Sequence, residues 1–131
     1  MEANKIIITG AATRMGAAIA KSLSGPGVEI VIHYNNSKTN AEKLKKELIK
    51  NHTKVYLIKG DLSKEKDLNK IIKFSKSKLR YFDCLINNAS LFENDNLRNF
   101  TSKSWDKHLD VNLKAPAYLT CLLYTSDAAD E

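Results

Sequence analysis

The clearest chemical pattern in this sequence lies near its N-terminus. Residues 5–16 read Lys-Ile-Ile-Ile-Thr-Gly-Ala-Ala-Thr-Arg-Met-Gly. The β-branched run before Gly10 predicts a strand buried on both faces, and the residues after Gly16 are typical of a helix. A glycine turn between a strand and a helix leaves backbone N–H groups and the positive end of the helix dipole available to an anion, commonly a diphosphate. The pattern therefore predicts a nucleotide site.

Strand and helix patterns alternate along the chain. Such alternation predicts an α/β protein whose parallel sheet is Rossmann-type and doubly wound, with right-handed crossovers. The sheet is expected to be truncated after its fourth strand and the following helix, with residues 1–120 as the N-terminal part of one dinucleotide-binding domain. The expected strands are 5–9, 28–34, 54–60 and 83–87, and the expected helices are 14–24, Ser37 or Thr39 to Ile49, Ser63 to Leu79, and Thr101 or Ser102 to Leu119.

Composition limits the classes of partner. The chain has 131 residues and a formal net charge of +6, from 21 Lys and Arg against 15 Asp and Glu. The lysines are scattered over expected helix surfaces without interleaved aromatic residues, so we expect no nucleic-acid partner. A nucleic-acid binder that uses this charge is the alternative, and its affinity would fall with salt. No apolar run approaches the roughly 20 residues that span a bilayer, and no signal peptide is recognised, so we expect a cytoplasmic protein without a membrane partner.

The cysteines carry no predicted chemistry. Cys84 and Cys121 lack the spacing of a disulfide framework or a zinc site, so no metal is expected. Cys84 lies in an expected apolar strand and is predicted to be a small buried hydrophobic residue.

Two motifs resemble one enzyme family. Residues 9–16 read Thr-Gly-x-x-x-Arg-x-Gly, which resembles the Thr-Gly-x-x-x-Gly-x-Gly motif of short-chain dehydrogenases/reductases. Residues 87–90, Asn-Asn-Ala-Ser, are similar to the family's Asn-Asn-Ala-Gly at the end of its fourth strand. Arg14 and Ser90 replace two family glycines, and both replacements are similar to the pteridine-reductase branch. The resemblance covers residues 5–120, the first half of a typical family member.

The resemblance implies a set of cofactor contacts. The pair Asp61-Leu62 matches the family pair beside the adenine ring, where a carboxylate can accept a hydrogen bond from the exocyclic amine. Ala89 matches a position that leaves room for the cofactor ribose. Taken alone, Asp61 would be a capping or loop residue and His33 a structural histidine. The residues expected to bind the cofactor are Thr9, Gly10, Arg14, Met15, Gly16, His33, Tyr34, Asn35, Asn36, Ser37, Asp61, Leu62, Asn88, Ala89 and Ser90.

Asn112 is the catalytic residue that the resemblance implies within this chain. It matches the asparagine of the family's Asn-Ser-Tyr-Lys catalytic set, whose amide helps to hold a water in the proton relay. An asparagine in mid-helix, four residues before Pro116, is otherwise unfavourable, and this local cost indicates a functional kink. An exposed polar helix residue is the alternative interpretation.

The end of the second expected strand indicates the preferred nicotinamide cofactor. A site for NAD places Asp or Glu there, where the carboxylate binds the ribose 2′-hydroxyl and repels a 2′-phosphate. This sequence has no acid between His33 and Lys38, and it has neutral donors at residues 35–37. Arg14 and Lys38 are cations expected nearby. We therefore expect NADPH.

The resemblance favours a pterin as the small-molecule substrate. Arg14, Ser90 and Phe92 match positions at which pteridine reductases contact the pterin, with the aromatic ring stacked opposite the nicotinamide. Phe92 is equally consistent with a loop anchor. A 3-oxoacyl thioester or a sugar-type carbonyl is the alternative substrate, and a non-catalytic nucleotide-binding module is the alternative class.

The family's catalytic Tyr-x-x-x-Lys motif has no convincing match. Only Tyr34 and Lys38 have this spacing, at a strand end, and we interpret the match as coincidence. The whole protein is expected to be a homo-oligomeric, NADPH-dependent oxidoreductase that transfers hydride to a C=O or C=N group, whereas this chain alone is expected to be inactive. Residues 121–131 resemble the translation of a transposon-based sequencing adapter, and we expect them to be a non-native tail.

Overall fold

A four-stranded parallel sheet organises the chain. The computed structural model describes residues 4–129. The strand order is β3-β2-β1-β4 and every neighbouring pair is parallel, which confirms the predicted Rossmann-type α/β fold. No helix among the described residues has the length and apolarity needed to cross a membrane. The elements are β1(Lys5–Ile8), α1(Arg14–Leu23), β2(Glu29–Tyr34), α2(Lys38–Lys50), β3(Lys54–Lys59), α3(Glu65–Leu79), β4(Cys84–Ile86), α4(Ser102–Leu109), the π-helical segment η1(Asp110–Lys114) and α5(Ala115–Ala129).

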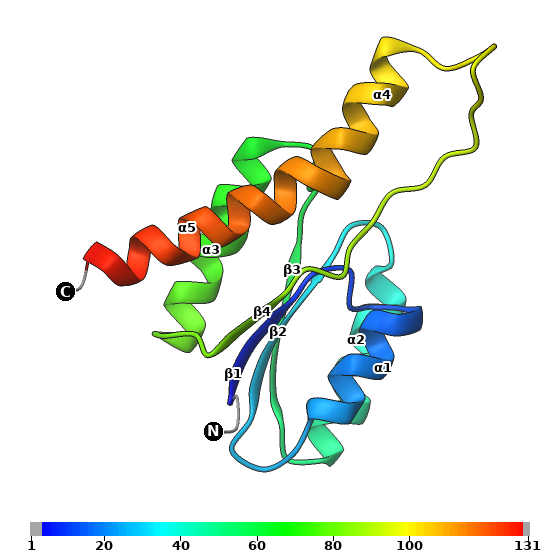
Figure 1. The fold of residues 1–131 in the computed structure, drawn as a ribbon. Helices are drawn as coiled ribbons and strands as arrows, with labels where there is room; N and C mark the ends of the chain where they lie inside the picture. Colours follow the sequence, from blue (N-terminus) through cyan, green and yellow to red (C-terminus); the bar gives the residue numbers. More distant parts are fainter. Residues whose placement is uncertain (1–3, 130–131) are drawn as a thin grey trace.

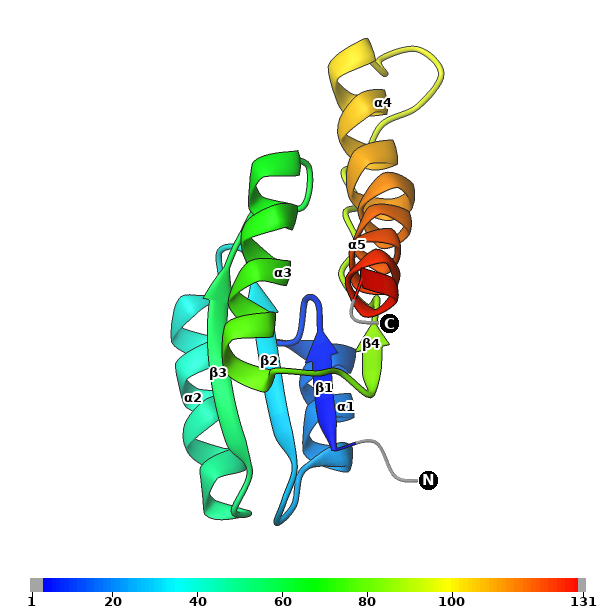
Figure 2. The ribbon, with the colours of Figure 1, turned by 90° about the vertical axis from the view of Figure 1, so that its left-hand side faces the viewer.

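Helices cover both faces of the sheet, as a doubly wound fold requires. α1 and α2 lie on one face, and α3 and α5 lie on the other (Figure 1 and Figure 2). Because successive residues of a strand point to opposite faces, Ile6 and Ile8 belong to the core under α1 and α2, whereas Ile7 belongs to the core under α3 and α5. The β-branched run of β1 is therefore buried on both sides, as predicted.

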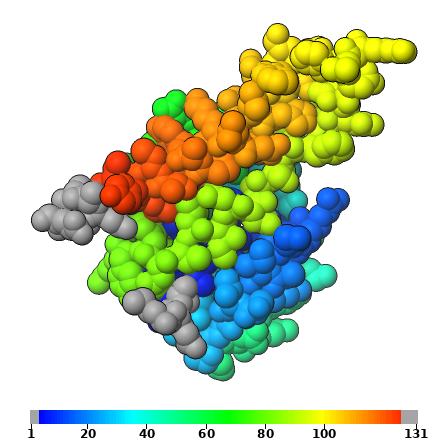
Figure 3. Space-filling view, in the orientation of Figure 1, coloured from blue at the N-terminus to red at the C-terminus, as the bar shows by residue number. Residues whose placement is uncertain are grey.

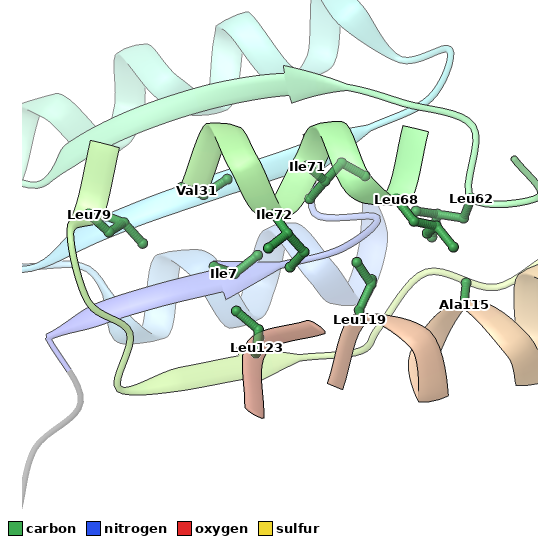
Figure 4. Close-up of a cluster of buried hydrophobic side chains, with 10 residues drawn as sticks. All are labelled: Ile7, Val31, Leu62, Leu68, Ile71, Ile72, Leu79, Ala115, Leu119 and Leu123. Atoms are coloured by element: carbon green, nitrogen blue, oxygen red, sulfur yellow. The ribbon is translucent and has the colours of Figure 1, made fainter. Parts of the chain in front are cut away.

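A cluster of ten buried residues joins the sheet to α3 and α5 (Figure 4). α3 contributes apolar residues at helical spacing, and the sheet contributes one residue from β1 and one from β2. α5 continues to Ala129 through the segment expected to be a tail, and Leu123 of that segment is buried. Residues 130–131 of the expected tail lie outside the described residues. The cluster consists of Ile7, Val31, Leu62, Leu68, Ile71, Ile72, Leu79, Ala115, Leu119 and Leu123.

The start of α3 differs from the prediction. The helix begins at Glu65, after the N-cap residue Lys64, and not at Ser63. The reason is that the backbone N–H and the hydroxyl of Ser63 both donate hydrogen bonds to Oδ1 of Asp61, at 2.9 Å and 2.7 Å. Ser63 therefore closes a turn around the Asp61 carboxylate, and its side chain is not available to the helix.

The helix expected from residue 101 to Leu119 is interrupted in the middle. Thr101 caps α4, as predicted, because its Oγ1 accepts a hydrogen bond from the backbone N–H of Ser104 at 3.1 Å. At η1 the pattern changes, and the N–H of Ala115 bonds to the carbonyl of Asp110, five residues earlier. Pro116 has no N–H to donate to the carbonyl four residues before it, which weakens the α-helical pattern here. Single π-helical turns are frequent at functional sites.

β4 forms an edge of the sheet. It pairs only with β1, through three residue pairs, and it ends at Ile86 where the sequence predicts a strand to residue 87. The prediction that Cys84 is buried is wrong, because this edge leaves its side chain partly exposed.

Replacing Ile71 with alanine should lower the free energy of unfolding by about 2–5 kcal/mol, because Ile71 is fully buried against the sheet and the change leaves a cavity. Ile49 of α2 is 50% exposed, so Ile49→Ala should cost less than about 1 kcal/mol. Urea denaturation followed by circular dichroism measures both values. Equal losses in the two variants would contradict the core described above.

Candidate functional site

The turn between β1 and α1 lies against the segment that follows β4. A Cβ atom added to Gly10, whose φ is +62°, would lie 2.7 Å from the Cα of Ala89. A Cβ added to Gly16 would meet the carbonyl oxygen of Gly10 and lie 2.6 Å from Nδ2 of Asn88. These two glycines therefore allow a backbone approach that any side chain would prevent.

Four hydrogen bonds connect the end of β1 to the segment after β4. Oγ1 of Thr9 accepts from the backbone N–H groups of Asn88 and Ala89, at 3.1 Å and 3.0 Å. In return, Nδ2 of Asn88 donates to the carbonyl groups of Thr9 and Gly10, at 3.2 Å and 3.0 Å. These bonds explain why β4 stops at Ile86, since the chain beyond it turns toward Thr9 to form them.

Arg14 occupies a strained backbone conformation at the first residue of α1. Its φ is +50°, in the left-handed region that glycine adopts without penalty. A glycine at this position would adopt the same conformation without strain. The first backbone N–H groups of α1 have no partner within the helix and are available to an anion.

His33, at the end of β2, connects two neighbouring turns. Its Nδ1 accepts a hydrogen bond from the backbone N–H of Gly10 at 3.0 Å, and its Nε2 lies 2.8 Å from the carbonyl of Gly60. A neutral ring with its proton on Nε2 satisfies both contacts. Burial lowers the pKa of His33, and the hydrogen bond to Gly60 opposes this only in part. The geometry therefore gives His33 a structural role beneath the site.

A cleft of about 990 Å³ lies over the carboxyl ends of the four strands. Thr9 and Tyr34 do not line it. Thr9 is buried and hydrogen-bonded to Asn88, and Tyr34 packs with Ala12 and Ala41. Gly16 lies under the turn and does not line it either. The structure brings together around the cleft the predicted residues Gly10, Arg14, Met15, His33, Asn35, Asn36, Ser37, Asp61, Leu62, Asn88, Ala89 and Ser90.

Five residues that sequence reasoning missed also line the cleft. Thr13 is the N-cap residue of α1, Leu91 and Glu93 come from the loop after β4, and Lys107 and Val111 come from α4 and η1. Lys107 and Val111 are four residues apart, a spacing that places them on one face of a helix, but the spacing does not indicate that this face borders the cleft.

Asp61 projects into the cleft after β3. Burial raises the pKa of this carboxyl, but the hydrogen bonds from Ser63 and the nearby lysine charges outweigh burial, and the net pKa lies below the ordinary value. Asp61 is therefore ionised near neutral pH. A carboxylate accepts hydrogen bonds from amine groups of a ligand.

Asn112 holds the loop that follows β4. Its Oδ1 accepts a hydrogen bond from the backbone N–H of Leu91 at 2.7 Å, and its Nδ2 donates to the carbonyl of Leu91 at 2.8 Å. Both polar atoms of the side chain are thus engaged with one residue of the loop. Phe92, the next residue, is 85% exposed and does not line the cleft.

Comparisons with known proteins agree with this architecture. Residues 4–127 match the family model described as short chain dehydrogenase. A short-chain dehydrogenase/reductase, FrzI, from Cladobotryum sp is 31% identical over 113 residues, which are 86% of this chain and 44% of that protein. The 3-oxoacyl-[acyl-carrier-protein] reductase FabG of Staphylococcus epidermidis is 29% identical over 108 residues, which are 82% of this chain and 44% of that protein.

A solved structure shows the same fold. FolM alternative dihydrofolate reductase 1 from Brucella canis, complexed with NADP, superposes with a TM-score of 0.79 at 29% identity, covering 88% of this chain and 46% of that one. The chain belongs to the short-chain dehydrogenase family. It spans less than half the length of the two curated relatives.

Gly16→Ala should disrupt the site, because the added methyl group meets backbone atoms and Asn88 that cannot move independently. We expect a loss of about 1–3 kcal/mol in the free energy of unfolding. Gly25→Ala is the matched control, since a Cβ at Gly25 meets nothing within 4 Å. Chemical denaturation of both variants measures the difference, and a Gly16→Ala variant as stable as Gly25→Ala would refute the close approach.

Stability should decrease as the pH falls below about 6.5, the ordinary value for histidine. The pKa of buried His33 is lowered in the folded chain. As the pH falls, the unfolded chain therefore binds a proton at His33 before the folded chain does, and this favours the unfolded state. His33→Gln should flatten the curve of unfolding free energy against pH in this interval. Exposed His52, changed to Asn, should leave the curve as in the wild type. A slope that His33→Gln leaves unaltered would contradict this assignment.

Proposed function

We propose that this chain forms the cofactor-binding half of an NADPH-dependent reductase acting on a C=O or C=N group. The observation that carries the proposal is the cleft, because all four strand ends contribute to it and its residues include most of the predicted cofactor set. The NADP complex of the 29% identical FolM protein supports the choice of cofactor.

The diphosphate would lie at the turn before α1. Gly10 and Gly16 bring the turn close to Asn88 and Ala89. The first N–H groups of α1 have no partner within the helix and could bind the diphosphate. Asp61 and Leu62 would contact the adenine, and Ala89 the ribose. The bound cofactor supplies the hydride.

Selectivity for the 2′-phosphate would come from the segment after β2. Asn35, Asn36 and Ser37 line the cleft without a carboxylate among them, and Arg14 lines the same cleft. Lys38, the other cation expected nearby, is the first residue of α2 and does not line the cleft. Lys107 also lines the cleft, but it is paired with Glu93 at 2.7 Å. We therefore assign Arg14 to the phosphate.

Asn112 would act as a positioning residue. Its side chain is bonded to the backbone of Leu91, so the amide fixes the loop that borders the cleft. The proton donor of the family motif would come from a part of the whole protein beyond this chain, and on this proposal the chain alone is inactive. The boundary of the native sequence at residue 120 is also a proposal, which sequencing of the gene across that position tests.

A pterin is the substrate that we favour for the whole protein. Arg14 and Ser90 both line the cleft, and the FolM relative carries the printed name dihydrofolate reductase. A 3-oxoacyl thioester is the second candidate, which the 29% identity to FabG supports. Oxidation of NADPH by the whole protein, with a dihydropterin and an acetoacetyl thioester as competing substrates, separates the two. We further propose that the whole protein is a homo-oligomer, which sedimentation tests.

NADPH should bind the chain about tenfold or more tightly than NADH, because a charge-assisted bond to the 2′-phosphate contributes about 1.5–3 kcal/mol. Fluorescence titration measures both affinities. Equal or tighter binding of NADH would refute the cofactor assignment.

Arg14→Gly should separate the charge of Arg14 from its backbone conformation. The variant should lose most of the preference for NADPH while unfolding at the same or a higher free energy, because glycine relieves about 1 kcal/mol of strain at φ +50°. Lys46→Met, which removes an exposed charge on α2, should leave the preference intact. If both variants lose the preference for NADPH equally, the preference comes from the net charge of the chain and not from Arg14.

A further inference from the structure

The loop at residues 88–100 is fastened to α4 and η1 along one side. The loop and α4 project from the body of the molecule (Figure 1 and Figure 3). Leu91 bonds to Asn112, and Asp95 accepts from Oγ of Ser104 at 2.6 Å. Between these contacts lies Glu93, whose backbone N–H donates to Nε2 of His108 at 3.0 Å. Since Leu91 and Glu93 line the cleft, these contacts define one of its walls.

The contacts of His108 require a neutral imidazole. Nε2 accepts from the N–H of Glu93, so it carries no proton. Nδ1 lies 2.8 Å from the backbone carbonyl of Ser104, a group that can only accept, so Nδ1 carries the proton. The neutral ring of His108 therefore donates its one N–H to the carbonyl of Ser104 on α4 and accepts one hydrogen bond from the N–H of Glu93 in the loop.

We infer that His108 is a pH-responsive positioning residue that fixes the cleft wall when its ring is neutral and releases Glu93 when the ring is protonated. The inference rests on the proposed function for its consequence, which is weaker cofactor binding in acid. A protonated ring presents N–H at both nitrogens, and an N–H facing the N–H of Glu93 cannot form the bond. Histidine is the side chain that makes this change between about pH 8 and pH 5.

The charged groups around His108 allow this change. Glu93 contacts it from the loop, and Asp95 accepts a hydrogen bond from Ser104, one helical turn before it. Lys107 precedes it on α4, and the charge of Asp61 acts on Lys107. The hydrogen bond and ion pair with Lys107, at 2.7 Å, lower the pKa of Glu93, so its carboxylate is ionised near neutral pH. A carboxylate beside a protonated ring attracts it, so the ring has an alternative partner once the backbone contact is lost.

The same geometry excludes a hydrolytic role for this cluster. The Ser104 hydroxyl donates to Asp95, and the protonated Nδ1 of His108 donates to the backbone carbonyl of Ser104 at 2.8 Å. The Ser104 hydroxyl oxygen lies farther from Nδ1, at 3.5 Å. The acceptor nitrogen is occupied by the loop. No ring nitrogen is free to take the serine proton, so the cluster can hold the loop but cannot activate a nucleophile.

Trp105 provides a test that needs no cofactor. It is the only tryptophan in the sequence, it follows Ser104, and its ring contacts that of Phe100 from the loop at a centroid distance of 6.2 Å. Its emission should change with pH between 8 and 5 in the wild type. His108→Gln, which keeps one donor and one acceptor without titrating, should remove the change, and His52→Asn should keep it. An identical transition in His108→Gln would overturn the inference.

A second measurement needs no variant. The ¹⁵N signals of the His108 ring in the unaltered chain at pH 8 should show a protonated Nδ1 and an unprotonated Nε2. The opposite tautomer would overturn the inference even if His108→Gln failed to fold.

Cofactor titration distinguishes this inference from the proposed function. Between pH 8 and pH 5 the wild type should lose NADPH affinity about fivefold more than His108→Gln, as expected for one lost hydrogen bond. Comparing the two proteins at each pH cancels the ionisation of NADPH itself. Equal losses in both overturn the inference while leaving the proposed function intact. Absence of NADPH binding at every pH, together with a Trp105 transition that depends on His108, refutes the proposed function and leaves the pH-responsive contact standing.

Discussion

The paired hydrogen bonds between Thr9 and Asn88 hold together the two strand ends on which the cleft is built. Only three residue pairs join β1 to β4 within the sheet, so the polar contacts beyond the strands must fix how these ends meet. They form only because Gly10 and Gly16 have no side chains. These hydrogen bonds thus fix the shape of the turn and end β4 at Ile86.

His33 extends this connection to the other two strands. It lies at the end of β2 and reaches the turn after β1 through Gly10 and the end of β3 through Gly60. Together, the histidine and Asn88 link the carboxyl ends of all four strands beneath the cleft. Both residues orient backbone groups at the cleft through these hydrogen bonds.

The fold and the strand-end residues of the cleft follow from sequence because the signals are local. A strand, a glycine turn and a helix follow one another within residues 5–23, and polar residues such as Asp61 come directly after a strand. Lys107 and Glu93 could not be predicted in the same way. They reach the cleft only because the loop after β4 and α4 come together beyond the strand ends, and that path depends on tertiary packing. The burial of His33 could not be predicted either, since its two hydrogen-bond partners, Gly10 and Gly60, are distant in sequence.

The π-helical turn at Asp110–Lys114 has a geometric consequence for the whole rod of helix in Figure 1. Each residue of an α-helix advances the side chains by about 100° around the axis. The additional residue in η1 offsets the two halves, so that Asn112 faces Leu91 while Ala115 and Leu119 still face the core. Shortening this segment by one residue would give a more regular helix. One half of that helix would then be rotated about the axis, so that its side chains would no longer face their present partners. The length of η1 sets the direction in which each half of the helix faces. The contact between Asn112 and Leu91 therefore depends on this length as well as on the identity of the asparagine.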